Sequence, residues 1–110
     1  MNFRSPALLQ FAKGQPCQRC RSTGTTVAAH ANSIAMGKGM GIKAHDYAVA
    51  YLCHPCHDLI DGRVGKLTKS ERDQEWRDAH IRTVALWFTT GMVEVCKGQT
   101  PLWSVHNTCD

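Results

Sequence analysis

The sequence predicts an α+β domain built from a two-stranded hairpin, one short helix and one long C-terminal helix. Two Cys-x-x-Cys pairs bracket the segment that we expect to form the hairpin, and a capped stretch with helical periodicity follows them. A chain of 110 residues has room for one domain with a modest core. We therefore predict a single domain over residues 1–96, with its core at 14–62, the long helix at about 69–90, and a loosely ordered tail at 97–110.

The first cysteine pair is Cys17 and Cys20, and the second is Cys53 and Cys56. Together they supply four thiolates, which suit one tetrahedral, structural Zn²⁺ ion. The 32 residues between the pairs (21–52) exceed the roughly 15 to 20 that are typical of a plain zinc ribbon. We therefore predict that the zinc ion holds an inserted segment in place. A redox pair, or two unrelated turns, is the alternative interpretation of these cysteines.

The N-terminal segment predicts a short helix that leads into the first cysteine pair. Ser5 is a typical N-cap, Pro6 suits the first helical position, and Gly14 ends the segment. After the pair, residues 25–29 favour a short strand that delivers His30 at its end.

The rest of the insert predicts a glycine loop and a second strand. Residues 36–43 contain three alternate glycines, which allow unusual backbone angles. Residues 47–52 favour a strand that runs into the second cysteine pair. The residues after Cys56 fit one or two helical turns that end at a glycine. In that helix His57 and Asp61 are four positions apart, so we expect them to share a face.

The long helix is predicted by its two ends and by its apolar spacing. Thr68 and Glu71 match a capping box, and Gly91 marks the end. Between them an apolar stripe should pack across the zinc-bearing unit. Its members are Trp76, His80, Thr83, Val84 and Trp87, with Ile81 and Phe88 widening the stripe.

Charge is distributed unevenly along the chain. Residues 1–45 hold six basic side chains and no acidic one, whereas residues 46–110 hold seven basic and nine acidic ones. A positive field beside the insert favours a polyanion such as nucleic acid, although solubility alone explains a net charge of +4. The candidate contacts to the phosphate backbone are Arg19, Arg21, Lys38 and Lys43.

Apolar stretches are far shorter than the roughly 20 residues of a membrane span, so we expect no membrane partner. No apolar signal segment follows Met1, which favours the reducing cytoplasm over an oxidising compartment.

The order of these features resembles the ββα-metal core, or His-Me finger, of HNH endonucleases, a treble-clef-like fold. A strand ends in His30, a glycine loop and Asp46 follow, and a second strand leads through the second cysteine pair to His57. This resemblance covers about residues 14–62. Over its whole length the chain is similar to a small phage and prophage nuclease family of the DUF1364 type. The shared elements are Lys-Gly-x-x-Cys, Ala-His and Cys-x-x-Cys-His-Asp-x-x-Asp.

The resemblance implies a metal-dependent endonuclease of phage or prophage origin that hydrolyses DNA phosphodiester bonds with little sequence specificity. His30 matches the general base, and Asp46 matches the residue that orients it. His57 and Asp61 match ligands of a catalytic Mg²⁺ or Mn²⁺ ion. The chain departs from the family pattern twice. Asp46 stands where the family usually has Asn, and Ala29 precedes the base where an Asp or His ligand is common.

Other interpretations stay open for each of these residues. His30 fits a core or supporting histidine, and His57 fits a spare zinc ligand. Asp61 fits an ordinary helix-end residue, and Asp46 fits the start of a strand. The rival to the nuclease is a non-catalytic zinc module that binds nucleic acid or a protein in a phage recombination assembly. DNA, with a recombination protein beside it, is the expected partner.

Overall fold

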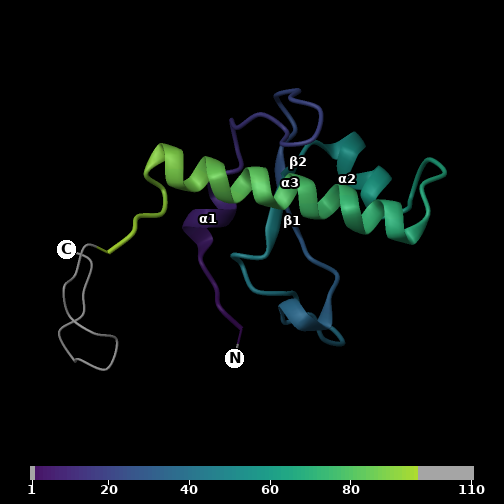
Figure 1. The fold of residues 1–110 in the computed structure, drawn as a ribbon, viewed down its shortest axis with the longest axis horizontal. Helices are drawn as coiled ribbons and strands as arrows, with labels where there is room; N and C mark the ends of the chain where they lie inside the picture. The colour runs from purple at the N-terminus through teal and green to yellow at the C-terminus, as the bar shows by residue number, and fades with distance from the viewer. Residues whose placement is uncertain (1, 97–110) are drawn as a thin grey trace.

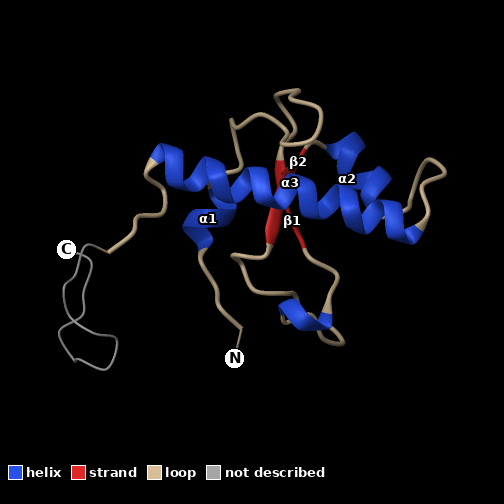
Figure 2. Ribbon diagram, viewed as in Figure 1, coloured by secondary structure: helices blue, strands red, loops and turns tan. Residues whose placement is uncertain are grey.

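The computed structural model of the protein describes residues 2–96. Two short strands lie at the centre, and the helices surround them (Figures 1 and 2). The elements in chain order are α1 (Pro6–Gln10), β1 (Val27–His30), the 3-10 turn η1 (Ile34–Met36), β2 (Val49–Leu52), α2 (His54–Ile60) and α3 (Lys69–Thr90).

The sheet is an antiparallel pair with a long connection. Val27 pairs with Leu52, and His30 pairs with Val49. Residues 31–48 join the strands, and Figure 1 shows this connection and the first cysteine segment at opposite ends of the hairpin. The hairpin therefore has a cysteine end, near Val27 and Leu52, and a loop end, near His30 and Val49.

Helix α3 covers the outer edge of β2 with side chains. His80 Nδ1 lies 2.6 Å from the carbonyl oxygen of Val49, and the backbone N–H of Tyr51 donates to Thr83 Oγ1 at 3.0 Å. Next along the edge, the backbone N–H of Gln18 donates to the Tyr51 carbonyl at 2.8 Å. A two-stranded sheet is marginal alone, so this pairing explains how β2 is fully buried.

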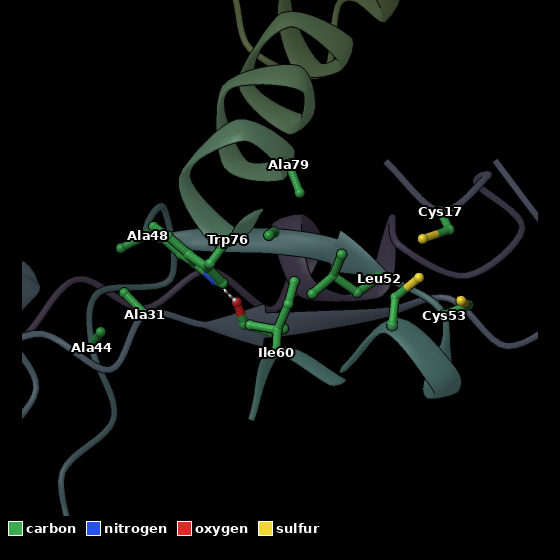
Figure 3. Close-up of a cluster of buried hydrophobic side chains, with 12 residues drawn as sticks. Cys17, Ala31, Ala44, Ala48, Leu52, Cys53, Ile60, Trp76 and Ala79 are labelled. Atoms are coloured by element: carbon green, nitrogen blue, oxygen red, sulfur yellow. Dashed lines mark hydrogen bonds between the residues drawn. The ribbon is translucent and has the colours of Figure 1, made fainter. Parts of the chain in front are cut away.

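The two faces of the hairpin carry two separate apolar clusters. On one face, Trp76 of α3 and Ile60 of α2 pack over the strands, and the Trp76 indole N–H donates to the Ala29 carbonyl at 3.0 Å (Figure 3). Figure 3 shows Cys17 and Cys53 at one end of this cluster and Ala31, Ala44 and Ala48 at the other.

On the opposite face, α1 meets the C-terminal part of α3. Leu8, Tyr51 and Trp87 are buried together there, and the Trp87 indole N–H donates to the Tyr51 hydroxyl at 2.8 Å. The Tyr51 hydroxyl in turn donates to the Leu8 carbonyl. This chain of hydrogen bonds satisfies buried polar groups inside the apolar cluster.

Most of the predicted element signals are confirmed. The Ser5 hydroxyl caps α1, and the capping box of Thr68 and Glu71 opens α3, which ends at Gly91 in a left-handed conformation. Helix α2 begins at His54, earlier than predicted, because Cys53 takes the N-cap position and a proline occupies the first turn.

One packing prediction is wrong. Ile81 and Phe88 were expected to widen the buried stripe, but they are 65% and 49% exposed. The buried residues of α3 are Trp76, Ala79, Thr83 and Trp87, a narrow seam, because the helix meets only a two-stranded sheet. The predicted tail at 97–110 lies outside the described residues. Within the described part of the chain, no helix is both long and apolar enough to cross a membrane.

Candidate metal centre and candidate active site

The four predicted zinc ligands come together at the cysteine end of the hairpin. Their sulfur atoms all lie within 4.8 Å of one another, and the sulfurs of Cys20 and Cys53 are 3.6 Å apart. Tetrahedral ligands at a Zn–S distance of about 2.3 Å would be separated by about 3.8 Å, so the cluster fits one zinc ion. All four cysteines are free thiols, which excludes a disulfide among them.

Hydrogen-bond donors point at the sulfurs of Cys17 and Cys56. The N–H groups of Arg19 and Cys20 both point at the sulfur of Cys17, at 3.4 Å each. The guanidinium of Arg19 also reaches the Cys56 sulfur at 3.5 Å. Donors that converge on sulfur stabilise its negative charge, as a metal-bound thiolate requires.

The metal-free thiols differ in acidity. Hydrogen bonding to Ser22 lowers the pKa of Cys20 to about 6, whereas burial raises the pKa of Cys56 to about 12 despite the hydrogen bond from Arg19. A zinc ion deprotonates its thiol ligands. Zinc binding at neutral pH should therefore release the proton of Cys56.

The candidate general base, His30, is paired with Asp46 at the loop end of the hairpin. His30 Nε2 lies 2.8 Å from Asp46 Oδ1, and the two side chains are only 15% and 4% exposed. An ionised carboxylate accepts hydrogen bonds only, so Asp46 assigns the proton to Nε2 and leaves Nδ1 of a neutral ring as the acceptor. The predicted pair is thus brought together.

Asp46 is held ionised by the segment before α1. The backbone N–H of Ser5 donates to Oδ2 at 2.7 Å, and the Arg4 guanidinium lies 3.1 Å from Oδ1. Burial alone would raise the pKa of Asp46, but the hydrogen bonds from His30 and Ser5 and the charges of His30 and Arg4 leave it below its ordinary value. Nothing in the sequence around Arg4 and Ser5 pointed to this role, because the contacts span some 40 residues.

The candidate ligands of a catalytic metal, His57 and Asp61, pair on helix α2. His57 Nε2 lies 3.2 Å from Asp61 Oδ2, and their side chains are 30% and 39% exposed. Arg63 also approaches Asp61, at 3.7 Å. An imidazole and a carboxylate are suitable donors for Mg²⁺ or Mn²⁺, but two ligands leave most coordination positions to water or phosphate.

The two pairs belong to opposite faces of the hairpin. His30 pairs with Val49 across the strands, which places it on the face that carries the α1 cluster. Helix α2 packs on the other face through Cys56 and Ile60. Among residues 2–96, the four cysteines form the only group of three or more His, Cys, Asp and Glu ligands close enough to hold an ion.

The four basic candidates divide between the two ends of the hairpin. At the cysteine end, Arg19 is occupied by Cys56 and by Glu75, the latter at 3.4 Å, while Arg21 is exposed. Lys38 and Lys43 lie in the connection between the strands, which leaves β1 directly after His30. Only this second group belongs to the same end of the hairpin as the candidate base.

Fold and site define a small α+β domain with four clustered cysteines that could hold a metal ion and a strand histidine bound to a carboxylate. The chain belongs to the family described as "Putative nuclease YbcO", which matches residues 6–92. It is similar to one solved structure, "Structure of a putative bacteriophage protein from Escherichia coli str. K-12 substr. MG1655", at 24% identity and a TM-score of 0.58. That match covers 76% of this chain and 98% of the other, and at such identity it shows the fold alone. No curated protein matches the chain.

Proposed function

We propose that the protein is a metal-dependent endonuclease of the HNH type that hydrolyses DNA phosphodiester bonds. Membership of a nuclease family supports the reaction class. The single observation that carries the assignment of residues is the bond between His30 Nε2 and Asp46 Oδ1 at 2.8 Å. It orients an imidazole whose free nitrogen can take a proton from the attacking water.

Each candidate residue has a separate role in the proposed hydrolysis. Asp46 holds the tautomer of His30 and stabilises the imidazolium that forms when the base takes a proton. His57 and Asp61 are the candidate ligands of a Mg²⁺ or Mn²⁺ ion that would supply positive charge for a phosphate, although they lie on the opposite face of the hairpin from His30. Lys38 and Lys43 meet the DNA backbone electrostatically, without reading bases. A zinc ion held by the four cysteines would fix the hairpin from which His30 projects.

A plasmid assay tests this proposal. Zinc-loaded protein is incubated with supercoiled plasmid alone, with Mg²⁺ and with Mn²⁺, and nicking is followed on gels. Removing a general base should slow nicking by about 10²- to 10⁴-fold in His30→Ala. His57→Ala and Asp61→Asn should raise the metal concentration that half-maximal activity requires. His54→Ala, at an exposed histidine of the same helix, is the matched control and should cut normally.

A second candidate function is a zinc module that binds nucleic acid or a recombination protein without cutting. The separation of the His30 and His57 pairs onto opposite faces of the hairpin favours it. The same assay separates the two candidates. DNA binding without nicking in either metal would support the module and refute the nuclease. Nicking that survives in folded His30→Ala protein would reveal a contaminating enzyme.

A further inference from the structure

Three aromatic rings lie together at the loop end of the hairpin, and we call Phe3, His45 and Tyr47 the ring platform. The His45 and Tyr47 rings are stacked, with centroids 4.8 Å apart and planes 10° apart. Phe3 lies 5.6 Å from Tyr47 with its plane tilted by 44°. Phe3 and Tyr47 are 48% and 49% exposed, so about half of each residue faces solvent. No role in cleavage or in the core accounts for this arrangement.

The ring platform is held in place by the backbone. The Phe3 N–H donates to His45 Nδ1 at 2.9 Å, and the Phe3 carbonyl accepts from the N–H of Asp46 at 2.9 Å. Asn2 adds hydrogen bonds to the carbonyls of Gly37 and Lys43. The rings thus line an open depression together with Asn2, Arg4 and Ile42. A site whose rings are fixed before binding loses little entropy when it receives a ligand.

The charge around the ring platform is positive. Arg4, Lys38 and Lys43 belong to the same segments, and residues 1–45 contain no acidic side chain. Asp46 is the nearest carboxylate in the sequence, but it is buried and engaged by Arg4 and His30. Exposed rings set among cations, without an exposed carboxylate in those segments, complement a polyanion that carries flat apolar groups. Nucleic acid with unpaired bases has that chemistry.

We propose that the ring platform binds single-stranded or locally unpaired nucleic acid by stacking a base on Tyr47 and Phe3. The cations of Lys38 and Lys43 meet the phosphates on either side. Bases in an intact duplex are already stacked on one another, so the platform favours single strands, flaps and distorted sites.

This inference rests on the proposed function, which makes DNA the substrate. It restricts that substrate to single-stranded or locally unpaired DNA. Asp46 lies between His45 and Tyr47 in the chain, and its carboxylate binds His30. The ring platform and the hydrogen-bond partner of the candidate general base therefore belong to one segment of the connection.

Binding is measured apart from cleavage, so the two proposals fail separately. All proteins carry His30→Ala, and no Mg²⁺ or Mn²⁺ is added. Fluorescence anisotropy follows a labelled single strand of about 12 thymidines, a length within the site sizes of single-strand binders, and a duplex of equal length. Tyr47→Ala should weaken single-strand binding about tenfold, the loss of one stacked base, and duplex binding by less than about twofold. Tyr47→Phe keeps the ring and should bind normally.

Phe88→Ala is the matched control, because Phe88 has the same 49% exposure as Tyr47 but belongs to α3. It should bind both oligonucleotides as the parent does. Zinc content and circular dichroism verify that each variant is folded. The proposal is overturned if folded Tyr47→Ala binds the single strand normally, if Phe88→Ala weakens binding equally, or if the parent prefers the duplex. A protein that prefers single strands in this way, yet cleaves neither a plasmid nor a labelled single strand with Mg²⁺ or Mn²⁺, would refute the nuclease and retain the platform.

Discussion

At the scale of single residues, the buried hydrogen bonds of the candidate active site converge on Asp46. One buried carboxylate accepts from His30, from the Arg4 guanidinium and from the Ser5 N–H, so it ties the strand, the connection and the N-terminal segment to one point. A buried acceptor with three donors is costly to remove, because each donor is left without its partner.

Asp46→Asn should lower the free energy of unfolding by about 1 to 3 kcal/mol at pH 7, the usual cost of disrupting such buried bonds. The native pKa of Asp46 is depressed, so its stabilisation is complete above the unfolded pKa of about 4 and is lost as pH falls through the native value. The difference between wild type and variant should therefore persist from pH 7 to pH 5 and shrink only below about pH 4. Urea unfolding at each pH measures it.

Asp58→Asn is the control for this titration. Asp58 is a partly exposed acid on α2, 3.5 Å from an Arg63 that is itself 69% exposed, and such pairs contribute little. It should change stability by less than about 0.5 kcal/mol at any of these pH values. An Asp46→Asn difference that vanishes between pH 7 and pH 5 would contradict the depressed pKa.

At the scale of elements, side chains of α3 form hydrogen bonds with the outer edge of β2, where a third strand would otherwise pair. Thr83 is fully buried, accepts from the Tyr51 N–H and donates to the Ala79 carbonyl at 2.8 Å. Thr83→Val keeps the shape but removes the acceptor, which leaves the Tyr51 N–H unpaired in the core. We expect a loss of about 1 to 3 kcal/mol in the free energy of unfolding.

Chemical denaturation checks this expectation against Thr89→Val. Thr89 is exposed, and its hydroxyl donates only to the Leu86 carbonyl of the same helix, so that control should stay within about 0.5 kcal/mol of wild type. Equal losses in the two variants would mean that valine disturbs the helix itself. The edge bond would then contribute nothing measurable.

The sequence predicted elements well where their signals are local. The capping box at Thr68 and the glycine at position 91 bound α3 because cap chemistry depends on residues within one turn. The side chains that pair the edge of β2 were not predictable, since His80 and Thr83 contact residues about 30 positions away. Helical periodicity likewise could not reveal that a two-stranded sheet leaves Ile81 and Phe88 exposed.

At the scale of the whole molecule, spacing predicted which residues meet at the four-cysteine centre but not on which face each candidate pair lies. Four thiols in two Cys-x-x-Cys pairs have few other ways to meet, so their cluster followed directly from the sequence. The face of His30 depends on strand register, and a shift of one residue would reverse it. The support of Asp46 by Arg4 depends on where the N-terminal segment crosses the loop, which no local pattern encodes.

The four-cysteine centre closes the loop between residues 17 and 56, and the fold should depend on it. Structural zinc in small domains contributes about 10 to 16 kcal/mol, as much as the whole net stability of a typical domain. Cys17→Ser should therefore lose its zinc and its cooperative thermal transition, as wild type should in excess chelator.

His57→Ala should keep one zinc per chain and melt within a few degrees of wild type, because four thiolates already complete the tetrahedron. Metal analysis and circular dichroism measure both. Zinc release from His57→Ala would make that histidine a ligand of the structural ion and remove it from the proposed active site, whereas a cooperative Cys17→Ser melt without zinc would show that packing of α3 on β2 suffices.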